Sequence, residues 1–151
     1  MNFKKILIYV PILFLAGMMI YGSISKFEKP NAQPDDVVEK AQEYLEKDKA
    51  SIATLVLYVG GMRQTGYAWL LVGLAELIFG ILLIIPKTRL IGSLGLLPIT
   101  LNILLFHAFL EPEHIGELIL AIAMFIINIG LISRFIRSKN YLLMDANIKE
   151  F

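Results

Sequence analysis

The sequence predicts an all-α integral membrane protein, a bundle of four transmembrane helices with an extracytoplasmic helical insertion between spans 1 and 2. Of its 151 residues, 57% are hydrophobic and 18% are charged, whereas soluble domains have close to half and about one-quarter. The apolar residues gather in blocks of about 20, the helix length that crosses ~30 Å of hydrocarbon. The basic residues of the short loops fall on one side of these blocks. Each of the three observations favours a bilayer protein.

We predict a single membrane domain over residues 1–151. The predicted segments are spans at about 6–25, 66–86, 90–110 and 116–133, an outer insertion at 26–65 and a cytoplasmic tail at 134–151. The first span follows two lysines, as a secretory signal would, but its apolar run is longer and no small-x-small cleavage site follows. We therefore interpret it as a retained anchor. Tyr67 and Trp69 open the second span with the aromatic pair typical of a headgroup boundary.

The insertion is predicted to contain two helices of different kinds. Asp35 and Asp36 follow Pro34 and are expected to supply the N-cap and a favourable charge for a soluble helix. The apolar stretch 51–62 is too short to span the bilayer, so we expect an interfacial or partly re-entrant helix. Gly60 and Gly61 are expected to break it.

Charge placement predicts the orientation of the spans. The basic residues that would share one side are Lys4, Lys5, Lys87, Arg89, Arg134, Arg137 and Lys139. The loop 111–117 contains neither lysine nor arginine. By the positive-inside rule both termini are expected in the cytoplasm, with the insertion and the acidic loop outside.

Glu76 is the most informative polar residue, because a carboxyl group near mid-bilayer is costly unless it faces protein or water, is paired or is protonated. It shares a helix face with Gly73 and Gly80, small residues that let another helix approach closely. Asn102 on the third span is predicted to lie at a similar depth: about 12 Å below the outer membrane boundary, where Glu76 is about 14 Å below it. We therefore expect Asn102 to be the hydrogen-bond partner of Glu76.

Four further residues complete the candidate site. Asn128 is expected deep in the fourth span and His107 near the outer end of the third, while Lys26 and Glu117 are outer-face candidates. Lys26 is expected to snorkel to the outer surface, in preference to pairing with an acidic residue of loop 111–117. The alternative interpretation of Glu76, and still more of the asparagines, is structural, since such side chains also hold transmembrane helices together.

The composition also excludes several classes of function. The absence of cysteine removes disulfides, thiol redox chemistry and cysteine-ligated metal clusters. A net charge of +1 without a basic run argues against nucleic-acid binding. His107 and His114 are separated across Pro112, so we predict no haem or metal site. No P-loop, nucleophile elbow or HExxH motif is present.

The second and third spans carry a pattern of glycine, proline, aromatic and polar residues in a specific order. These residues are Gly66, Tyr67, Gly73, Glu76, Gly80, Pro98, Asn102, Phe106, His107, Phe109, Leu110, Pro112 and Gly116, with Gly22 and Lys26 at the end of the first span. The pattern resembles the DoxX-like family of small bacterial membrane proteins. The resemblance fades over residues 28–49. It implies a four-helix bundle in the bacterial cytoplasmic (inner) membrane. It also implies an accessory role, since named members accompany quinone-linked oxidation and other relatives accompany disulfide maturation.

Three functions fit these residues. The leading hypothesis is a non-catalytic accessory subunit that docks a redox or envelope partner, or a second copy of itself. The alternative is an oxidoreductase subunit that binds a quinone or lipid-like reductant, with Glu76 as proton acceptor and Asn102 or His107 holding the headgroup. The third is transport of a small solute, which four short spans without an evident repeat support weakly. The sequence does not identify the ligand, the partner, the oligomeric state, the role of residues 28–49 or the protonation state of Glu76.

Overall fold

The computed structural model describes residues 3–28 and 31–137, and this part of the chain is entirely helical apart from its loops. The helices are α1 (Phe3–Glu28), α2 (Pro34–Glu46), α3 (Ala50–Gln64), α4 (Ala68–Ile84), α5 (Arg89–Phe109) and α6 (Ile115–Arg137). The predicted all-α class is confirmed for the described residues. Residues 138–151, which include Lys139 and most of the predicted tail, lie outside them.

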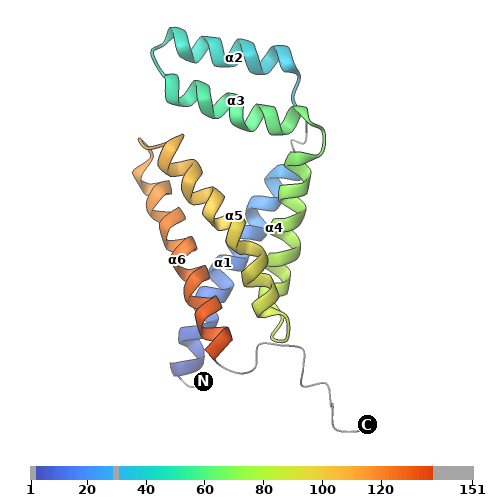
Figure 1. The fold of residues 1–151 in the computed structure, drawn as a ribbon, viewed down its shortest axis with the longest axis vertical. Coiled ribbons are helices and arrows are strands. Elements are labelled where there is room, and N and C mark those ends of the chain that lie inside the picture. The colour runs from blue at the N-terminus through green and yellow to red at the C-terminus, as the bar shows by residue number, and fades with distance from the viewer. Residues whose placement is uncertain (1–2, 29–30, 138–151) are drawn as a thin grey trace.

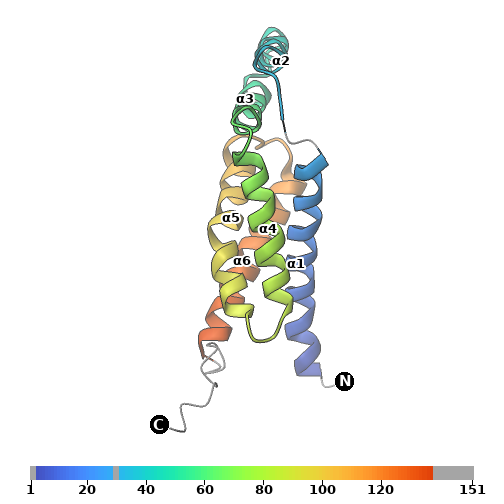
Figure 2. The same ribbon diagram turned by 90° about the vertical axis from the view of Figure 1, so that its right-hand side faces the viewer.

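Four helices lie side by side, and a helical hairpin lies across one end of them (Figures 1 and 2). α1 packs on α4, α4 on α5, and α5 on α6, while α2 packs on α3 to form the hairpin. Apolar side chains fill the space between the long helices, chiefly Ile12, Leu15, Met19, Leu83, Leu96, Met124 and Leu131. We call the end covered by α2 and α3 the hairpin end.

Among the described residues, length and composition identify three helices that could cross a membrane: α1 from Ile8, α5 and α6. α4 qualifies only together with α3, from which it is bent by 87°. The predicted second span at 66–86 is therefore shorter than expected, a helix of 17 residues. Gly66 has φ +75, outside the helical region, and Ile85, which precedes Pro86, is extended as residues before proline prefer. These two residues set the limits of α4.

The insertion differs from the prediction in two details. Gln33, not an aspartate, occupies the N-cap of α2 without a side-chain bond; Pro34 takes the first helical position and the aspartates fill the first turn. α3 continues through Gly60 and Gly61, which were expected to end it. A Cβ at Gly60 would collide with the Val37 side chain. Gly60 therefore serves the close packing of α2 on α3.

Glycines also allow close packing between the long helices. Gly73 and Gly80 lie against α1, where an added Cβ would be 3.0 Å from Lys26 Cβ and 3.3 Å from Ile20 Cγ1. This confirms the prediction that their face of α4 meets another helix. Gly92 lies against α4 itself, because its Cβ would come within 2.5 Å of the Leu83 backbone nitrogen. The close contact of α1, α4 and α5 thus depends on glycines, which have no side chain to separate the helices.

Candidate functional site

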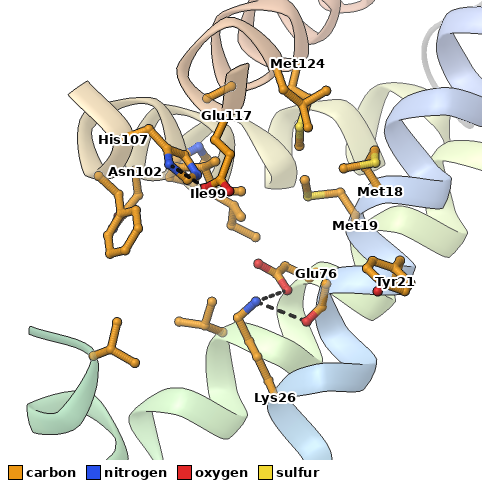
Figure 3. A pocket seen from close by; sticks show the side chains of 18 of the residues that line it. Met18, Met19, Tyr21, Lys26, Glu76, Ile99, Asn102, His107, Glu117 and Met124 are labelled. Carbon is orange, nitrogen blue, oxygen red and sulfur yellow. Dashed lines mark hydrogen bonds and ion pairs between the residues drawn. The ribbon is translucent and has the colours of Figure 1, made fainter. Parts of the chain in front are cut away.

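A cavity of about 580 Å³ lies at the hairpin end, lined by residues of α1, α3, α4, α5 and α6. Its walls are mostly apolar and include four methionines, Met18, Met19, Met62 and Met124. Methionine is unbranched and polarisable, so such walls adapt to ligands of different shape. Figure 3 shows Lys26 and Glu76 on one side of the cavity, with polar residues of α5 and α6 facing them. The volume falls within the range of about 300–1,000 Å³ that is usual for small-molecule sites.

Lys26 and Glu76 form an ion pair that joins α1 to α4. Lys26 Nζ donates to Glu76 Oε2 at 2.7 Å and to the Gly22 carbonyl at 3.2 Å, and it lies 5.2 Å from the centre of the Trp69 ring. The Lys26 side chain is 13% exposed and that of Glu76 is 3% exposed. The expectation that Lys26 snorkels outward was wrong. Gly73 leaves room for its stem to cross the α4 surface, so the ammonium reaches the carboxylate.

Asn102 lines the same cavity but has another partner than the one predicted. The Tyr58 hydroxyl donates to Asn102 Oδ1 at 3.2 Å, and the Tyr58 ring lies 5.9 Å from that of Phe106. Asn102 and Glu76 line one cavity, but the expected hydrogen bond between them was wrong, since Glu76 pairs with Lys26 and Asn102 with Tyr58. Tyr58 comes from α3, which folds over the hairpin end. Tyr58 reaches Asn102 only because α3 and α4 are bent by 87° relative to each other. The spacing of residues within α3 does not predict this bend.

His107 and Glu117, the residues expected near the outer end, come together at the rim of the cavity. His107 Nδ1 lies 3.1 Å from Glu111 Oε2 and 3.6 Å from Glu117 Oε2. His114 Nδ1 is 3.8 Å from the other oxygen of Glu111. Glu111 was not among the predicted site residues. Its spacing of four from His107 was a signal that the two could meet across a helix end.

Asn128 is fully buried and stands apart from the residues that line the cavity. Its amide nitrogen donates to Thr100 Oγ1 at 3.2 Å, and Thr100 Oγ1 in turn donates to the Leu96 carbonyl at 3.0 Å. This geometry favours the structural interpretation of Asn128, a polar link between α6 and α5. Thr100 was missed because a threonine in an apolar helix commonly bonds its own backbone and gives no pairing signal.

Two buried polar atoms of the cavity-lining residues, Trp69 Nε1 and His107 Nδ1, have no hydrogen-bond partner within the described part of the chain. The indole nitrogen of Trp69 is buried and has no hydrogen-bond acceptor. Buried donors are usually paired, so an unpaired one beside a cavity indicates an acceptor supplied from elsewhere. Trp69 stands next to the Lys26 ammonium, which places two donors on the same wall of the cavity.

Comparison of the chain with protein-family models, with curated proteins and with solved structures gives no match.

Proposed function

We propose that the chain is a four-span membrane protein that holds a lipid-like ligand of the quinone type at its hairpin end, as an accessory subunit of a redox or envelope complex. α1, α4, α5 and α6 are the four spans, and α2 and α3 form the extracytoplasmic insertion. The DoxX-like resemblance supports this architecture and its place in a bacterial inner membrane. In this proposal α4 is a short span, since its 17 residues extend for about 25 Å, the lower limit for a helix that crosses ~30 Å of hydrocarbon.

The observation that carries the proposal is the Lys26–Glu76 ion pair beside a mainly apolar cavity. Burying two charges costs about as much as their attraction returns, so such a pair is a poor way to stabilise a bundle. Ionisable groups inside membrane proteins are instead typical of binding or proton sites. An apolar cavity with a few polar groups on facing walls suits a ring with carbonyl or hydroxyl groups and an apolar tail.

The polar groups suggest how such a ligand would lie. The Lys26 ammonium has three donors, and its two acceptors in the structure leave one for a ligand carbonyl. Asn102 and His107 face that wall from α5, at the position of a second ligand oxygen. The methionines would contact the ring and the tail. Glu76 is the group that would accept a proton if the ligand is oxidised, which is the catalytic version of this proposal.

Quenching of Trp69 fluorescence tests the proposal, because Trp69 is the single tryptophan and lines the cavity. Purified protein in detergent would be titrated with short-chain ubiquinone and menaquinone analogues. We expect saturable quenching that weakens at least about tenfold in the double variant Lys26→Met/Glu76→Leu, which loses the charge-assisted hydrogen bond from the Lys26 ammonium to the ligand carbonyl. Thr100→Val is the matched control, since it removes a buried polar group of α5 outside the cavity. Absence of saturable binding, or equal weakening by Thr100→Val, would refute the proposal.

The orientation has its own test, because the chain contains no cysteine. Single cysteines at Asp48 and at Lys87 would be labelled in intact cells with a membrane-impermeant maleimide. We expect labelling of Asp48→Cys alone, with Lys87→Cys labelled only after lysis. The reverse pattern would invert the topology.

A further inference from the structure

Three side chains with metal-binding groups meet where the loop joins α5 to α6. His107 lies in the last turn of α5, Glu111 follows the helix, and Glu117 lies in the first turn of α6. One ligand atom from each residue lies within 4.8 Å of those of the other two. The His107 and Glu111 side chains are mostly buried, at 17% and 18% exposed, while Glu117 reaches in from an exposed position.

The distances fit ligands around one cation. Zinc binds imidazole nitrogen and carboxylate oxygen at about 2.0–2.2 Å, so two ligands at a tetrahedral angle lie about 3.4 Å apart. His107 Nδ1 is 3.1 Å from Glu111 Oε2 and 3.6 Å from Glu117 Oε2. Both values lie within about 0.3 Å of that separation. The two separations from His107 therefore fit a shared ion, and the two carboxylate oxygens lie within 4.8 Å of each other.

Hydrogen bonding does not account for this arrangement. His107 Nδ1 is buried and has no hydrogen bond of acceptable geometry within the described chain, although a carboxylate oxygen lies 3.1 Å away. An imidazole nitrogen and two carboxylate oxygens therefore lie close together without a hydrogen bond that uses the nitrogen. Two carboxylate charges also match a divalent ion. One nitrogen and two oxygens favour a transition ion such as Zn²⁺ over Ca²⁺ or Mg²⁺, which prefer oxygen alone.

Backbone hydrogen bonds hold the loop that carries the ligands. The His114 amide donates to the Glu111 carbonyl at 3.1 Å, and the Glu117 amide donates to the His114 carbonyl at 3.0 Å. His114 Nδ1 also lies 3.8 Å from Glu111 Oε1, within reach of a further ligand position. The site is therefore largely preorganised, with only the exposed Glu117 side chain left to fix.

We propose that His107, Glu111 and Glu117 bind a divalent transition-metal ion of the zinc class at the rim of the cavity. The ion links the end of α5 to the start of α6. It neutralises two carboxylates beside a cavity that otherwise presents only one cation, Lys26, among its lining residues. This site shares His107 with the quinone-type ligand site proposed above, but it can exist without that ligand.

Titration calorimetry with Zn²⁺ alone tests the site in purified full-length protein. We expect saturable, stoichiometric binding that weakens at least about tenfold in each of His107→Gln, Glu111→Gln and Glu117→Gln. Glu113→Gln is the matched control, because it removes a charge from the same loop outside the cluster. Co²⁺ provides an independent readout, with visible absorption bands that should disappear in His107→Gln. Circular dichroism would establish that each variant keeps its helix content.

Three outcomes would overturn the proposal. The first is absence of saturable Zn²⁺ binding to the unsubstituted protein, which would leave a histidine ion-paired with two carboxylates. The second is binding that His107→Gln leaves unchanged. The third is an equal loss in Glu113→Gln, which would indicate general attraction to an acidic loop. Quinone quenching by Glu111→Gln separates this result from the proposed function, because Glu111 is not among the residues that line the cavity and its replacement leaves the Lys26–Glu76 wall intact.

Discussion

Separating the two members of the Lys26–Glu76 pair should destabilise the fold, and the two single substitutions should differ in size. Lys26→Met leaves a carboxylate that is 3% exposed and has lost its partner. Glu76→Leu leaves a lysine near the end of α1, whose side chain is 13% exposed and whose stem can extend toward water. The buried carboxylate has no such escape. Lys26→Met should therefore be the more damaging change.

The magnitudes follow from burial. Removing one partner of a buried pair costs about 3–5 kcal/mol, which we assign to Lys26→Met. Snorkelling should reduce the cost of Glu76→Leu to about 1–2 kcal/mol. The double variant Lys26→Met/Glu76→Leu replaces both charges by apolar groups and should lie within about 1 kcal/mol of the unsubstituted protein, or above it. The coupling energy of the cycle should then be at least about 3 kcal/mol.

The assay is unfolding by SDS in mixed micelles, followed by far-ultraviolet circular dichroism and by Trp69 fluorescence. Glu43→Gln provides the control, because its ion pair with Lys47 lies on the exposed surface of α2 and should add nothing measurable. Two results would contradict this reasoning: Lys26→Met unfolds at the same SDS concentration as the unsubstituted protein, or Glu76→Leu is less stable than Lys26→Met. In either case the Glu76 carboxylate is not held in a site that excludes water. The double variant also separates roles, since it should keep the fold and lose the quinone-type ligand.

Two further predictions concern helix packing at glycines. Gly92→Ala places a Cβ 2.5 Å from the α4 backbone and should lower the free energy of unfolding by about 1–3 kcal/mol in the same assay. Gly17→Ala is the control, because its Cβ enters open space and should be neutral or stabilising. Equal stability of the two variants would refute this packing. Gly60→Ala should separate α2 from α3 through a clash with Val37, which would appear as faster amide hydrogen exchange over residues 34–46. Gly61→Ala is the control, because its Cβ meets no atom within 4 Å and should leave the exchange unchanged. Slow exchange in both variants would contradict the hairpin geometry.

Some features of the site could be predicted from sequence because they depend on one helix at a time. Helical spacing placed Gly73, Gly80 and Glu76 on one face, and counting along the axis placed Asn102 at the depth of Glu76. The first argument is confirmed, since the glycines meet α1, and the two polar residues line one cavity. The partners failed because a partner belongs to another helix. Which helix lies beside Glu76, and which side chain crosses to it, depend on packing.

Composition and periodicity by themselves determined that this chain is helical, apolar enough for a membrane and rich in close helix contacts, because these properties are local or additive along the chain. The tertiary structure decided which polar groups meet. It brought Lys26 across Gly73 to Glu76, folded Tyr58 over Asn102 through the 87° bend, and gathered His107, Glu111 and Glu117 at one loop. The contacts Lys26–Glu76, Tyr58–Asn102 and His107–Glu117 each join different helices, so their geometry is set by how the helices pack rather than by the spacing of residues within any one of them.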